Sequence, residues 1–450
     1  MVDNGTRVFP SSTLGIDYPP EDPETDYDPY SKKKPKQPAI SNVQAFFFLI
    51  HGVVGTGILQ AGFVFREGWI IGIIMTVSIG IICAHCQYIL FKAKYRVCKT
   101  MKVPYMKYAL SVERAFEFGP IYLRRYSRLS YYLVDGCFIL TQLGLCCLFG
   151  ATALRIAPVA DGLFRNWLDF EVNMSILFHT SIFIPLLLSA IMINLRIVAQ
   201  FAVLGVILLI ASIFIFFGYV AQDFEPTGSF EMLDVELITL PIYIATLVFS
   251  FESVTVLIYL DHHLKSPRTF LKPYGIMTKG MLLIIFMQCI LGISLYWKFD
   301  FDSLMISNIP IYFRTNEILA VSTGLYSIYS FISYGLHEYI FVEVMWRKTK
   351  KRSTCTRIFV CALPVMVSGT YMLSKAYTEL IFPECFVTAI LGTVVPILGI
   401  IIPVLMDISL NWPHNFKRAK LIYIKNIFLL LFGLLSIFCN FIFCLLPRII

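Results

Sequence analysis

Charged residues are scarce in this chain, and their scarcity excludes an ordinary soluble protein. Only 15% of the 450 residues are charged, whereas 57% are hydrophobic and the mean hydropathy is +0.73. A soluble protein of this length needs far more polar surface to face water. The composition therefore predicts an integral membrane protein embedded in a lipid bilayer.

The chain also lacks the short motifs on which an enzyme assignment would rest. It has no Walker loop, no dinucleotide-binding fingerprint and no nucleophile elbow. Its twelve cysteines do not form a disulfide framework, because most lie in apolar runs or basic loops. The pair in "CAHC", Cys83 and Cys86, has a metal-like spacing without a second pair, which favours apolar packing of the thiols. We therefore expect no enzymatic activity, no cofactor and no metal.

Long apolar runs are what the chain has in abundance. Each is long enough to cross about 30 Å of hydrocarbon. We predict eleven membrane-spanning helices within a transmembrane domain of residues 41–447, at 41–65, 69–93, 130–157, 173–193, 197–218, 238–260, 273–297, 316–345, 357–374, 379–406 and 425–447. Residues 1–40, which end in the basic "SKKKPKQP", contain too few apolar residues for a core and are expected to be a disordered cytoplasmic tail. They also lack the pattern of a signal peptide.

Lysine and arginine are distributed unevenly among the loops, and this bias predicts the orientation. The loop at 95–129 is basic, as is "RKTKKR" at 347–352, whereas the loop "QDFEPTGSFEMLDVE" after the fifth span contains only acidic charges. Positive loops are retained in the cytoplasm. The N-terminus is therefore expected inside and the C-terminus outside. The net charge of +8 thus reflects topology and does not indicate a nucleic-acid partner.

Two spans carry groups that lipid tolerates poorly. Gly55, Thr56 and Gly57 fall halfway through the first span, and Glu252 lies near the middle of the sixth, in "TLVFSFESVTVLIYLD". A charge at the bilayer centre costs roughly 3 kcal/mol or more. Taken singly, a glycine pair is typical of close helix packing, and a buried acid of interhelical hydrogen bonding. Interruptions in the first and the sixth span, which occupy corresponding positions in two halves of the membrane domain, instead predict a transporter site built on inverted repeats.

The physical chemistry of such breaks indicates the ligand. An unwound helix at the midplane must satisfy its freed backbone groups, so it is stable where it lines a cavity. The half-helix after Gly57 directs N–H groups and a partial positive charge at that cavity, which suits a carboxylate. Carbonyls at the ends of the broken halves suit an ammonium group, and glycine lets a ligand approach the backbone closely.

Five motifs, in order along the chain, carry a resemblance. They are "GTGIL" in the first span, "TQLGLCC" in the third, "INLR" after the fourth, "FSFES" in the sixth and "YIFVEV" ending the eighth. Together they resemble the proton-coupled amino acid transporters, a branch of the amino acid/auxin permease family, and "DYDPY" in the tail is similar to insect members. The resemblance implies an all-α polytopic protein with a LeuT-type five-plus-five inverted repeat and an eleventh transmembrane helix. It also implies symport of small neutral amino acids with protons.

The same resemblance assigns roles to residues in the two broken spans. Gly55, Thr56 and Gly57 would receive the substrate carboxylate. The facing wall would comprise Phe249, Ser250, Phe251 and Glu252. Apart from the resemblance, we expect the Ser253 hydroxyl to face the substrate, and Tyr326 and Ser330, about one helical turn apart in the eighth span, to line the cavity. The family's usual coupling histidine is replaced here by Phe48, and its usual glycine after the glutamate by Ser253.

Proton coupling then depends on other groups, and we expect His51 and Glu252 to provide it. His51 lies one turn after Phe48 and titrates in the useful range, although a purely structural, hydrogen-bonded histidine is the alternative. His337, Glu338 and Glu343 crowd the inner half of the eighth span, either as an inner gate or in a wetted vestibule.

The sequence therefore predicts a secondary active transporter in the plasma membrane or an endolysosomal membrane. Its partners would be small amino acids, protons as the coupling ion, and the lipid bilayer. Two alternatives remain: a non-transporting amino acid sensor, and a uniporter whose flux is indifferent to pH.

Overall fold

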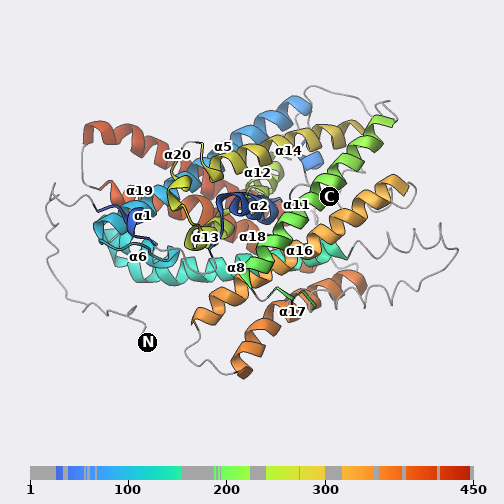
Figure 1. Ribbon diagram of the computed structural model, residues 1–450. Helices are drawn as coiled ribbons and strands as arrows, with labels where there is room; N and C mark the ends of the chain where they lie inside the picture. Colours follow the sequence, from blue (N-terminus) through green and yellow to red (C-terminus); the bar gives the residue numbers. More distant parts are fainter. Residues whose placement is uncertain are drawn as a thin grey trace.

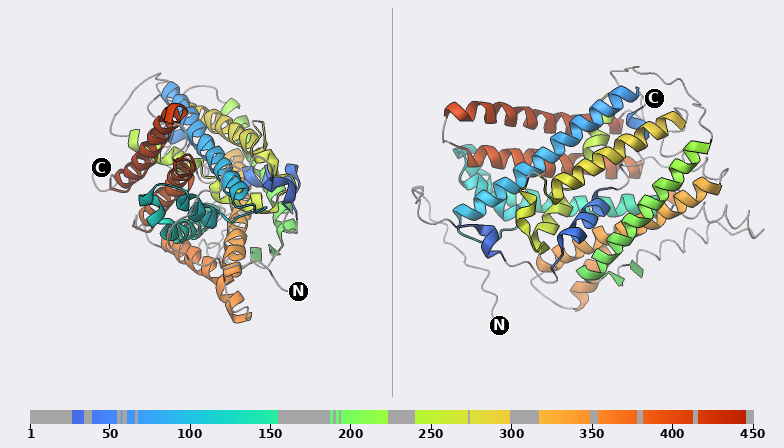
Figure 2. Two further views of the ribbon diagram at one scale, coloured as in Figure 1. Left: turned by 90° about the vertical axis from the view of Figure 1, so that its left-hand side faces the viewer. Right: turned by 45° about the horizontal axis from the view of Figure 1, so that its top comes forward.

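The fold is described from a computed structural model of the chain (Figures 1 and 2). The structure describes residues 27–33, 39–54, 57, 61–65, 68–154, 187–188, 191–192, 194–222, 240–272, 274–298, 317–348, 354–377, 382–412 and 416–445. The fourth expected span, at 173–193, lies almost wholly outside these residues, as do Gly55 and Thr56.

Helices coincide with the other expected spans. They are α2 (Asn42–Val53) and α4 (Ala61–Val64), α5 (Trp69–Thr100), α8 (Ser127–Ala153), α11 (Leu195–Gln222), α12 (Leu240–Ser250) and α13 (Val254–His263), α14 (Ile276–Lys298), α16 (Glu317–Lys348), α17 (Thr354–Tyr377), α18 (Phe382–Pro396), η3 (Ile397–Ile401) and α19 (Ile402–Leu410), and α20 (Phe416–Leu445). The basic loop after α5 holds two shorter helices, α6 (Tyr108–Glu117) and α7 (Ile121–Arg125).

Length and composition allow most of these helices to cross a bilayer. Within the described residues, 8 helical segments are long and apolar enough to span a membrane. α16 is as long as α5 but is interleaved with Ser, Tyr, His and Glu side chains. The predictions of an almost wholly helical fold and of an integral, multi-pass membrane protein are therefore confirmed.

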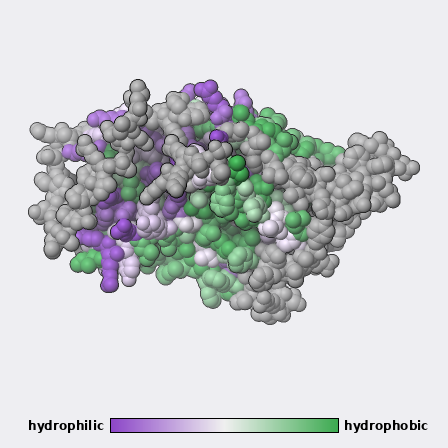
Figure 3. Space-filling view, turned by 90° about the horizontal axis from the view of Figure 1, so that it is seen from below, coloured by the Kyte–Doolittle hydropathy of each residue, from purple (hydrophilic) through white to green (hydrophobic). Residues whose placement is uncertain are grey.

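The outer surface of the bundle is apolar. Phe214, Phe286 and Phe438 each leave more than half of their surface uncovered by the described chain, at 70%, 61% and 62%. In Figure 3, hydrophobic residues cover the middle of the molecule and hydrophilic residues gather mainly toward one end. A surface of this kind is stable against lipid tails and would be costly in water.

The two interrupted spans lie inside this shell. Figure 1 shows α2, α12 and α13 near the centre, with α5, α11, α14 and α16 around them. In the span formed by α12 and α13, 83% of an 18-residue apolar stretch is buried, a larger share than in any other span within the described residues. α2 itself begins with a capping box, in which Ser41 and Gln44 each accept the other's backbone N–H. The elements expected to build the site are therefore shielded from lipid.

The tenth expected span, at 379–406, contains an interruption that was not predicted. Between α18 and α19, residues Ile397–Ile401 form a π-helical turn. Pro403 in the first turn of α19 cannot donate to the carbonyl of Gly399, and its ring pushes that carbonyl aside. A wider turn accommodates this displacement, and such turns are frequent at functional sites.

The end of the N-terminal tail is folded, which corrects the expectation of disorder over the whole of residues 1–40. Pro29–Lys32 form the short helix α1, capped by the Asp28 side chain. Lys33 is buried with its Nζ 2.7 Å from Oδ1 of Asp261, and Nζ of Lys94 lies 2.6 Å from Oδ2 of the same carboxylate. Burial lowers the pKa of Lys33, and Asp261 opposes that shift. The tail's own composition could not reveal partners that lie on α5 and α13.

Replacing Asp261 with asparagine should destabilise the protein strongly. The substitution leaves two ammonium groups buried without a counter-charge, which typically costs about 3–5 kcal/mol. We expect a clearly lowered melting temperature, measured in detergent by intrinsic fluorescence.

Asp28→Asn is the matched control for this prediction. Asp28 pairs with Arg268, whose side chain is 58% exposed, and such pairs contribute at most about 1 kcal/mol. Asparagine still caps α1, so only the charge is removed. Equal melting temperatures for the two variants would contradict the prediction.

Candidate functional site

The helix of the first span ends where the sequence predicted an interruption. α2 stops at Val53, and Val54 has the non-helical dihedrals φ −71° and ψ 88°. The Val54 N–H still bonds the Ile50 carbonyl at 2.9 Å, so the helix is intact up to this point. Gly55 and Thr56, assigned to the substrate carboxylate, follow directly but lie outside the described residues.

The sixth span is unwound over three residues. α12 ends at Ser250 and α13 begins at Val254, which leaves Phe251, Glu252 and Ser253 between them. The Glu252 N–H bonds the Phe249 carbonyl at 3.0 Å, which tightens the last turn of α12. The predicted discontinuity at "FSFES" is therefore present.

The two breaks meet at Gly57 and Ser250. Oγ of Ser250 lies 3.4 Å from the Gly57 carbonyl oxygen, and Nε2 of Gln288 on α14 lies 3.4 Å from the same oxygen. A Cβ at Gly57 would lie 2.7 Å from Cα of Ser250. Glycine is thus required here because the two backbones touch.

Tyr329 of α16 holds the end of α2. Its hydroxyl lies 3.0 Å from the His51 carbonyl oxygen and also within reach of the Val54 carbonyl oxygen. The last carbonyls of a helix lack donors from a following turn, and the Tyr329 hydroxyl, which has one hydrogen, lies where it can donate to either of these two. Tyr329 and Gln288 were not among the predicted site residues, although Tyr326, Tyr329, Ser330 and Ser333 have the i, i+3, i+4, i+7 spacing of one helix face.

Glu252 caps the half-helix that follows it. Its Oε1 accepts the Thr255 N–H and the Thr255 hydroxyl, both at 3.1 Å. A carboxylate at a helix N-terminus is stabilised by the unpaired N–H groups and by the helix dipole. The Glu252 side chain thus provides an acceptor for an N–H group in the first turn of α13, and both of these donors belong to that helix.

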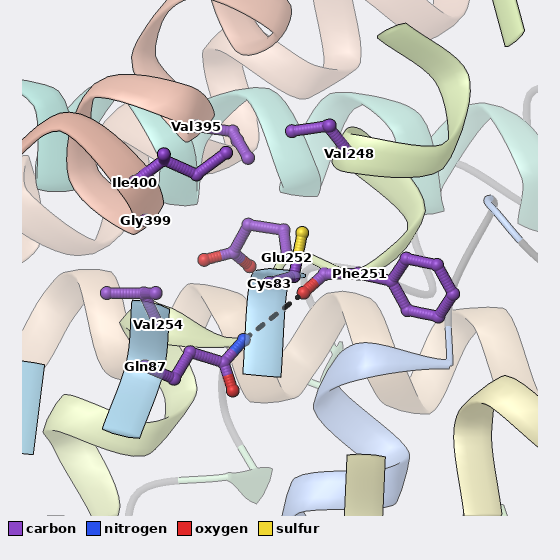
Figure 4. A pocket seen from close by; sticks show the side chains of 9 residues that line it. All are labelled: Cys83, Gln87, Val248, Phe251, Glu252, Val254, Val395, Gly399 and Ile400. Carbon is purple, nitrogen blue, oxygen red and sulfur yellow. Dashed lines mark hydrogen bonds between the residues drawn. The ribbon is translucent and has the colours of Figure 1, made fainter. Parts of the chain in front are cut away.

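A small cavity lies beside this carboxylate. Its wall comes from Cys83 and Gln87 of α5, from Val248, Phe251, Glu252 and Val254, and from Val395, Gly399 and Ile400 around the π-helical turn. Figure 4 shows the Gln87 amide donating to the Phe251 carbonyl, a contact of 3.5 Å. The free space holds about one water molecule, so this cavity does not admit an amino acid in the present conformation.

The remaining wall residues are only partly brought together. Phe251 is buried, and Phe249 packs half-buried against the apolar core. The Ser253 hydroxyl is directed at Sδ of Met281, at 3.7 Å, and the Ser330 hydroxyl bonds the Tyr326 carbonyl in its own helix at 2.9 Å. The described contacts of Ser253 and Ser330 therefore do not join them to Gly57.

The two residues expected to couple protons have different surroundings. His51 is fully buried; its Nε2 lies 3.3 Å from Oγ of Ser333, and the Tyr329 ring meets it edge-on. The partners of Glu252 lie instead on α13 and around the cavity against α5. Within the described residues, no cluster of three His, Cys, Asp or Glu side chains could hold a metal ion.

Comparisons with known proteins agree with this architecture. The family described as "Transmembrane amino acid transporter protein" matches residues 38–446. The "Proton-coupled amino acid transporter-like protein pathetic" of Drosophila melanogaster is 27% identical over 423 residues, which cover 91% of this chain and 85% of that protein.

Solved structures resemble the chain at the level of the fold. A mutant of the Eremococcus coleocola manganese transporter has a TM-score of 0.53 at 14% identity, covering 92% of this chain and 90% of the other. The same transporter in complex with an aromatic bis-isothiourea substituted compound has a TM-score of 0.52 at 12% identity, covering 88% and 86%. The expected LeuT-type helical fold is confirmed at this level, whereas the five-plus-five inverted repeat with an eleventh helix stays a prediction.

Adding a methyl group at Gly57 should disrupt the contact between the two breaks. In Gly57→Ala the new Cβ meets the Ser250 backbone, which cannot rotate away as a flexible side chain can. We expect transport of any substrate to fall by about tenfold or more, because small misplacements at a binding site are costly. This fall in transport is measured as the initial rate of uptake, normalised to the amount of protein at the membrane.

Gly136→Ala on α8 is the control, because a Cβ there meets nothing within 4 Å. Its uptake should stay within about twofold of the unmodified protein, since alanine suits a helix better than glycine does. Similar uptake by the two variants would show that the close approach at Gly57 is dispensable.

Proposed function

Because the chain belongs to the transmembrane amino acid transporter family, we propose that it is a secondary active transporter of small neutral amino acids coupled to protons. The family comprises transporters and not enzymes. The observation that carries the proposal is the meeting of two interrupted helices at Gly57 and Ser250 in the centre of the bundle. The name of the Drosophila relative supports proton coupling.

The geometry at the breaks supports an amino acid as ligand. The side chains of Ser250 and Gln288 each lie 3.4 Å from the Gly57 carbonyl oxygen, and a substrate ammonium at this place would form a shorter, charge-assisted hydrogen bond with that oxygen. The backbone N–H groups after the first break suit the carboxylate. The contact between Gly57 and Ser250 leaves little room for a bulky side chain, which favours a small amino acid.

Transport would proceed by rocking around the two breaks between outward-open and inward-open states. We propose His51 and Glu252 as coupling residues, with protons as the coupling ion and no other cofactor. Protonation of Glu252 removes a negative charge from the N-terminus of α13 and weakens the acceptor that holds Thr255. The loop charges favour a cytoplasmic N-terminus, and the membrane would be the plasma membrane or an endolysosomal membrane.

Uptake measurements test the function directly. Cells that display the protein at their surface should take up one or more small neutral amino acids from a panel, faster at acidic than at neutral external pH, with an inward current. Absence of acid-stimulated uptake across the panel would refute symport. Flux indifferent to pH would identify a uniporter, and binding without flux in reconstituted vesicles would identify a sensor.

Glu252→Gln should flatten the dependence of uptake on pH while preserving the fold. The amide oxygen of glutamine still accepts from Thr255, so the cap persists, but the side chain no longer binds a proton. Uptake at pH 5.5 and pH 7.5 should differ by less than about twofold in this variant if its titration drives the cycle.

Glu113→Gln in α6 serves as the control, because Glu113 lies in the basic loop and away from both breaks. Its dependence on pH should match that of the unmodified protein. A Glu252→Gln variant that retains the full acid stimulation would remove Glu252 from the coupling mechanism.

A further inference from the structure

An exposed stretch that is both basic and aromatic joins the loop after α5 to the third span. Its sequence is "IYLRRYSRLSYYL", residues 121–133, and it comprises α7 and the first two turns of α8. Tyr126 separates the two helices, with φ −100° and ψ 9°. The side chains of Arg124, Arg125 and Arg128 are all exposed. The proposed transport function uses none of these residues.

Large uncharged side chains are exposed on the same stretch. Ile121 leaves 83% of its surface uncovered by the described chain, and Tyr122 and Tyr132 leave 63% and 61%. Leu129 and Leu133, one turn apart on α8, leave 59% and 41%. Such a concentration of apolar surface is costly in water and stable against lipid. The stretch therefore presents guanidinium groups and lipid-compatible surface side by side.

The stretch lies at the hydrophilic end of the bundle, where the lipid-facing side of α8 begins. α6, the helix before α7, is near the left end in Figure 1, and hydrophilic residues gather at the left end in Figure 3, which keeps left and right unchanged. Leu129, Leu133 and Leu140 are exposed at i, i+4 and i+11 on one face of α8. Tyrosine is enriched where membrane and water meet. We therefore expect the arginines at the level of the lipid headgroups.

The described part of the chain does not neutralise the three guanidinium groups. Nη2 of Arg124 reaches the Gly119 carbonyl oxygen at 3.4 Å, a long hydrogen bond to an uncharged group. Glu113 of α6 attracts Arg128 electrostatically. Within the described residues, no acidic side chain forms an ion pair with any of the three arginines. Positive charge is therefore available here to an anion from outside the chain.

Two acidic side chains near this stretch are paired elsewhere. Glu117 of α6 pairs with Arg114 of the same helix at 2.7 Å. Asp135, two turns after Arg128 on α8, pairs with Lys348 at the end of α16. Both carboxylates already have a cationic partner, so neither compensates the arginines of residues 121–133.

The combination of charge and apolar surface indicates the chemistry of the partner. Arginine forms bidentate, charge-assisted hydrogen bonds with phosphate groups. A soluble anion or a nucleic acid would bind the arginines but leave the leucine face of α8 without a partner. A phospholipid has both an anionic headgroup and acyl chains. Basic clusters directly cytoplasmic of a membrane helix attract anionic lipids for this reason.

We propose that residues 121–133 form a binding surface for an anionic phospholipid of the cytoplasmic leaflet. Arg124, Arg125 and Arg128 contact its headgroup, and its acyl chains lie along Leu129 and Leu133. This surface is separate from the site at the two helix breaks. Binding of the lipid does not depend on the proposed transport function.

A lipid bound here would stabilise the third span. α8 packs against α6, α16 and α18, so it is part of the bundle that holds the interrupted helices. A ligand that binds the folded protein and not the unfolded chain raises the melting temperature by mass action. Lipid binding at residues 121–133 is therefore expected to be visible as thermal stabilisation.

The test is a lipid titration of the purified, delipidated full-length protein in detergent. Phosphatidylserine and phosphatidylcholine with the same acyl chains are compared, and native mass spectrometry measures how many lipids each protein retains. Phosphatidylserine should bind about tenfold more tightly than phosphatidylcholine and raise the melting temperature. Combining Arg124→Gln, Arg125→Gln and Arg128→Gln should abolish this preference, because glutamine stays polar but has no charge.

The matched control combines Lys99→Gln, Lys102→Gln and Lys107→Gln. These lysines are exposed in the same loop, and the change removes the same charge. No large hydrophobic residue among 99–107 is exposed as those of 121–133 are. The lysine variant should keep its preference for phosphatidylserine within about twofold, because the partner needs both kinds of surface.

A soluble headgroup distinguishes a lipid site from a site for a free anion. Glycerophosphoserine has the phosphodiester and the serine of phosphatidylserine but no acyl chains. It should displace phosphatidylserine only at concentrations about a hundredfold higher or more, because each buried methylene of the chains adds to the affinity. Displacement at similar concentrations would assign the arginines to a soluble anion and overturn the lipid site.

The other outcomes are equally decisive. Equal affinity for the two lipids in the unmodified protein overturns the proposal, and so does an equal loss of preference in the arginine and lysine variants. If the triple arginine variant melts lower than the unmodified protein without added lipid, Arg125→Gln alone decides. It should weaken phosphatidylserine binding by about threefold or more, and unchanged binding overturns the proposal. Transport is not measured, so these results leave the proposed function to its own test.

Discussion

Hydrogen bonding of backbone groups inside the bilayer is the constraint on which the rest of this structure depends. Helices cross the membrane because their own N–H and C=O groups bond one another. Where a helix stops, other groups must form hydrogen bonds with the backbone N–H and C=O groups that are left over. Tyr329 supplies one at the end of α2, Ser250 and Gln288 reach the Gly57 carbonyl, and Glu252 accepts the Thr255 N–H at the start of α13. Side chains of this kind allow two broken helices to exist in the centre of a bundle.

Ionisable groups in the interior have two different kinds of surroundings. Lys33 and Lys94 are paired with Asp261, so their charges persist although all three side chains are almost fully buried. His51 and His337 are instead fully buried beside neutral groups, His51 with Nε2 next to Oγ of Ser333 and His337 with Nδ1 next to Oε1 of Gln142. A paired charge stabilises one arrangement of the helices, because separating it costs several kcal/mol. A histidine side chain can gain and lose a proton near neutral pH, which a proton-coupled transport cycle requires.

Elements that depend on local composition were the ones that could be predicted. The apolar runs predicted most of the described spans to within about four residues, although α5 ends seven residues later and α20 begins nine residues earlier than expected. The glycines and the glutamate predicted the interruptions near Val54 and at 251–253. The π-helical turn at Ile397–Ile401 was missed because Pro403 is compatible with several distortions of a helix. Folding of Tyr27–Lys33 was missed because its cause, Asp261, lies 228 residues after Lys33. Tyr329, Gln142 and His337 were visible as polar residues in apolar runs, but their partners were not.

The sequence by itself determined that this is a helical membrane protein, where its helices run and where two of them break. Those properties follow from hydropathy and backbone chemistry, which act over one or two helical turns. Only the tertiary structure decided which polar groups meet: that Glu252 caps α13 and lines a cavity against α5, and that His51 faces Ser333 on α16. The physical reason is that lipid tails are as apolar as leucine, so hydrophobicity does not tell a membrane helix which face to turn toward its neighbours. Packing, small residues and interhelical hydrogen bonds set that rotation, and they exist only once the helices have assembled.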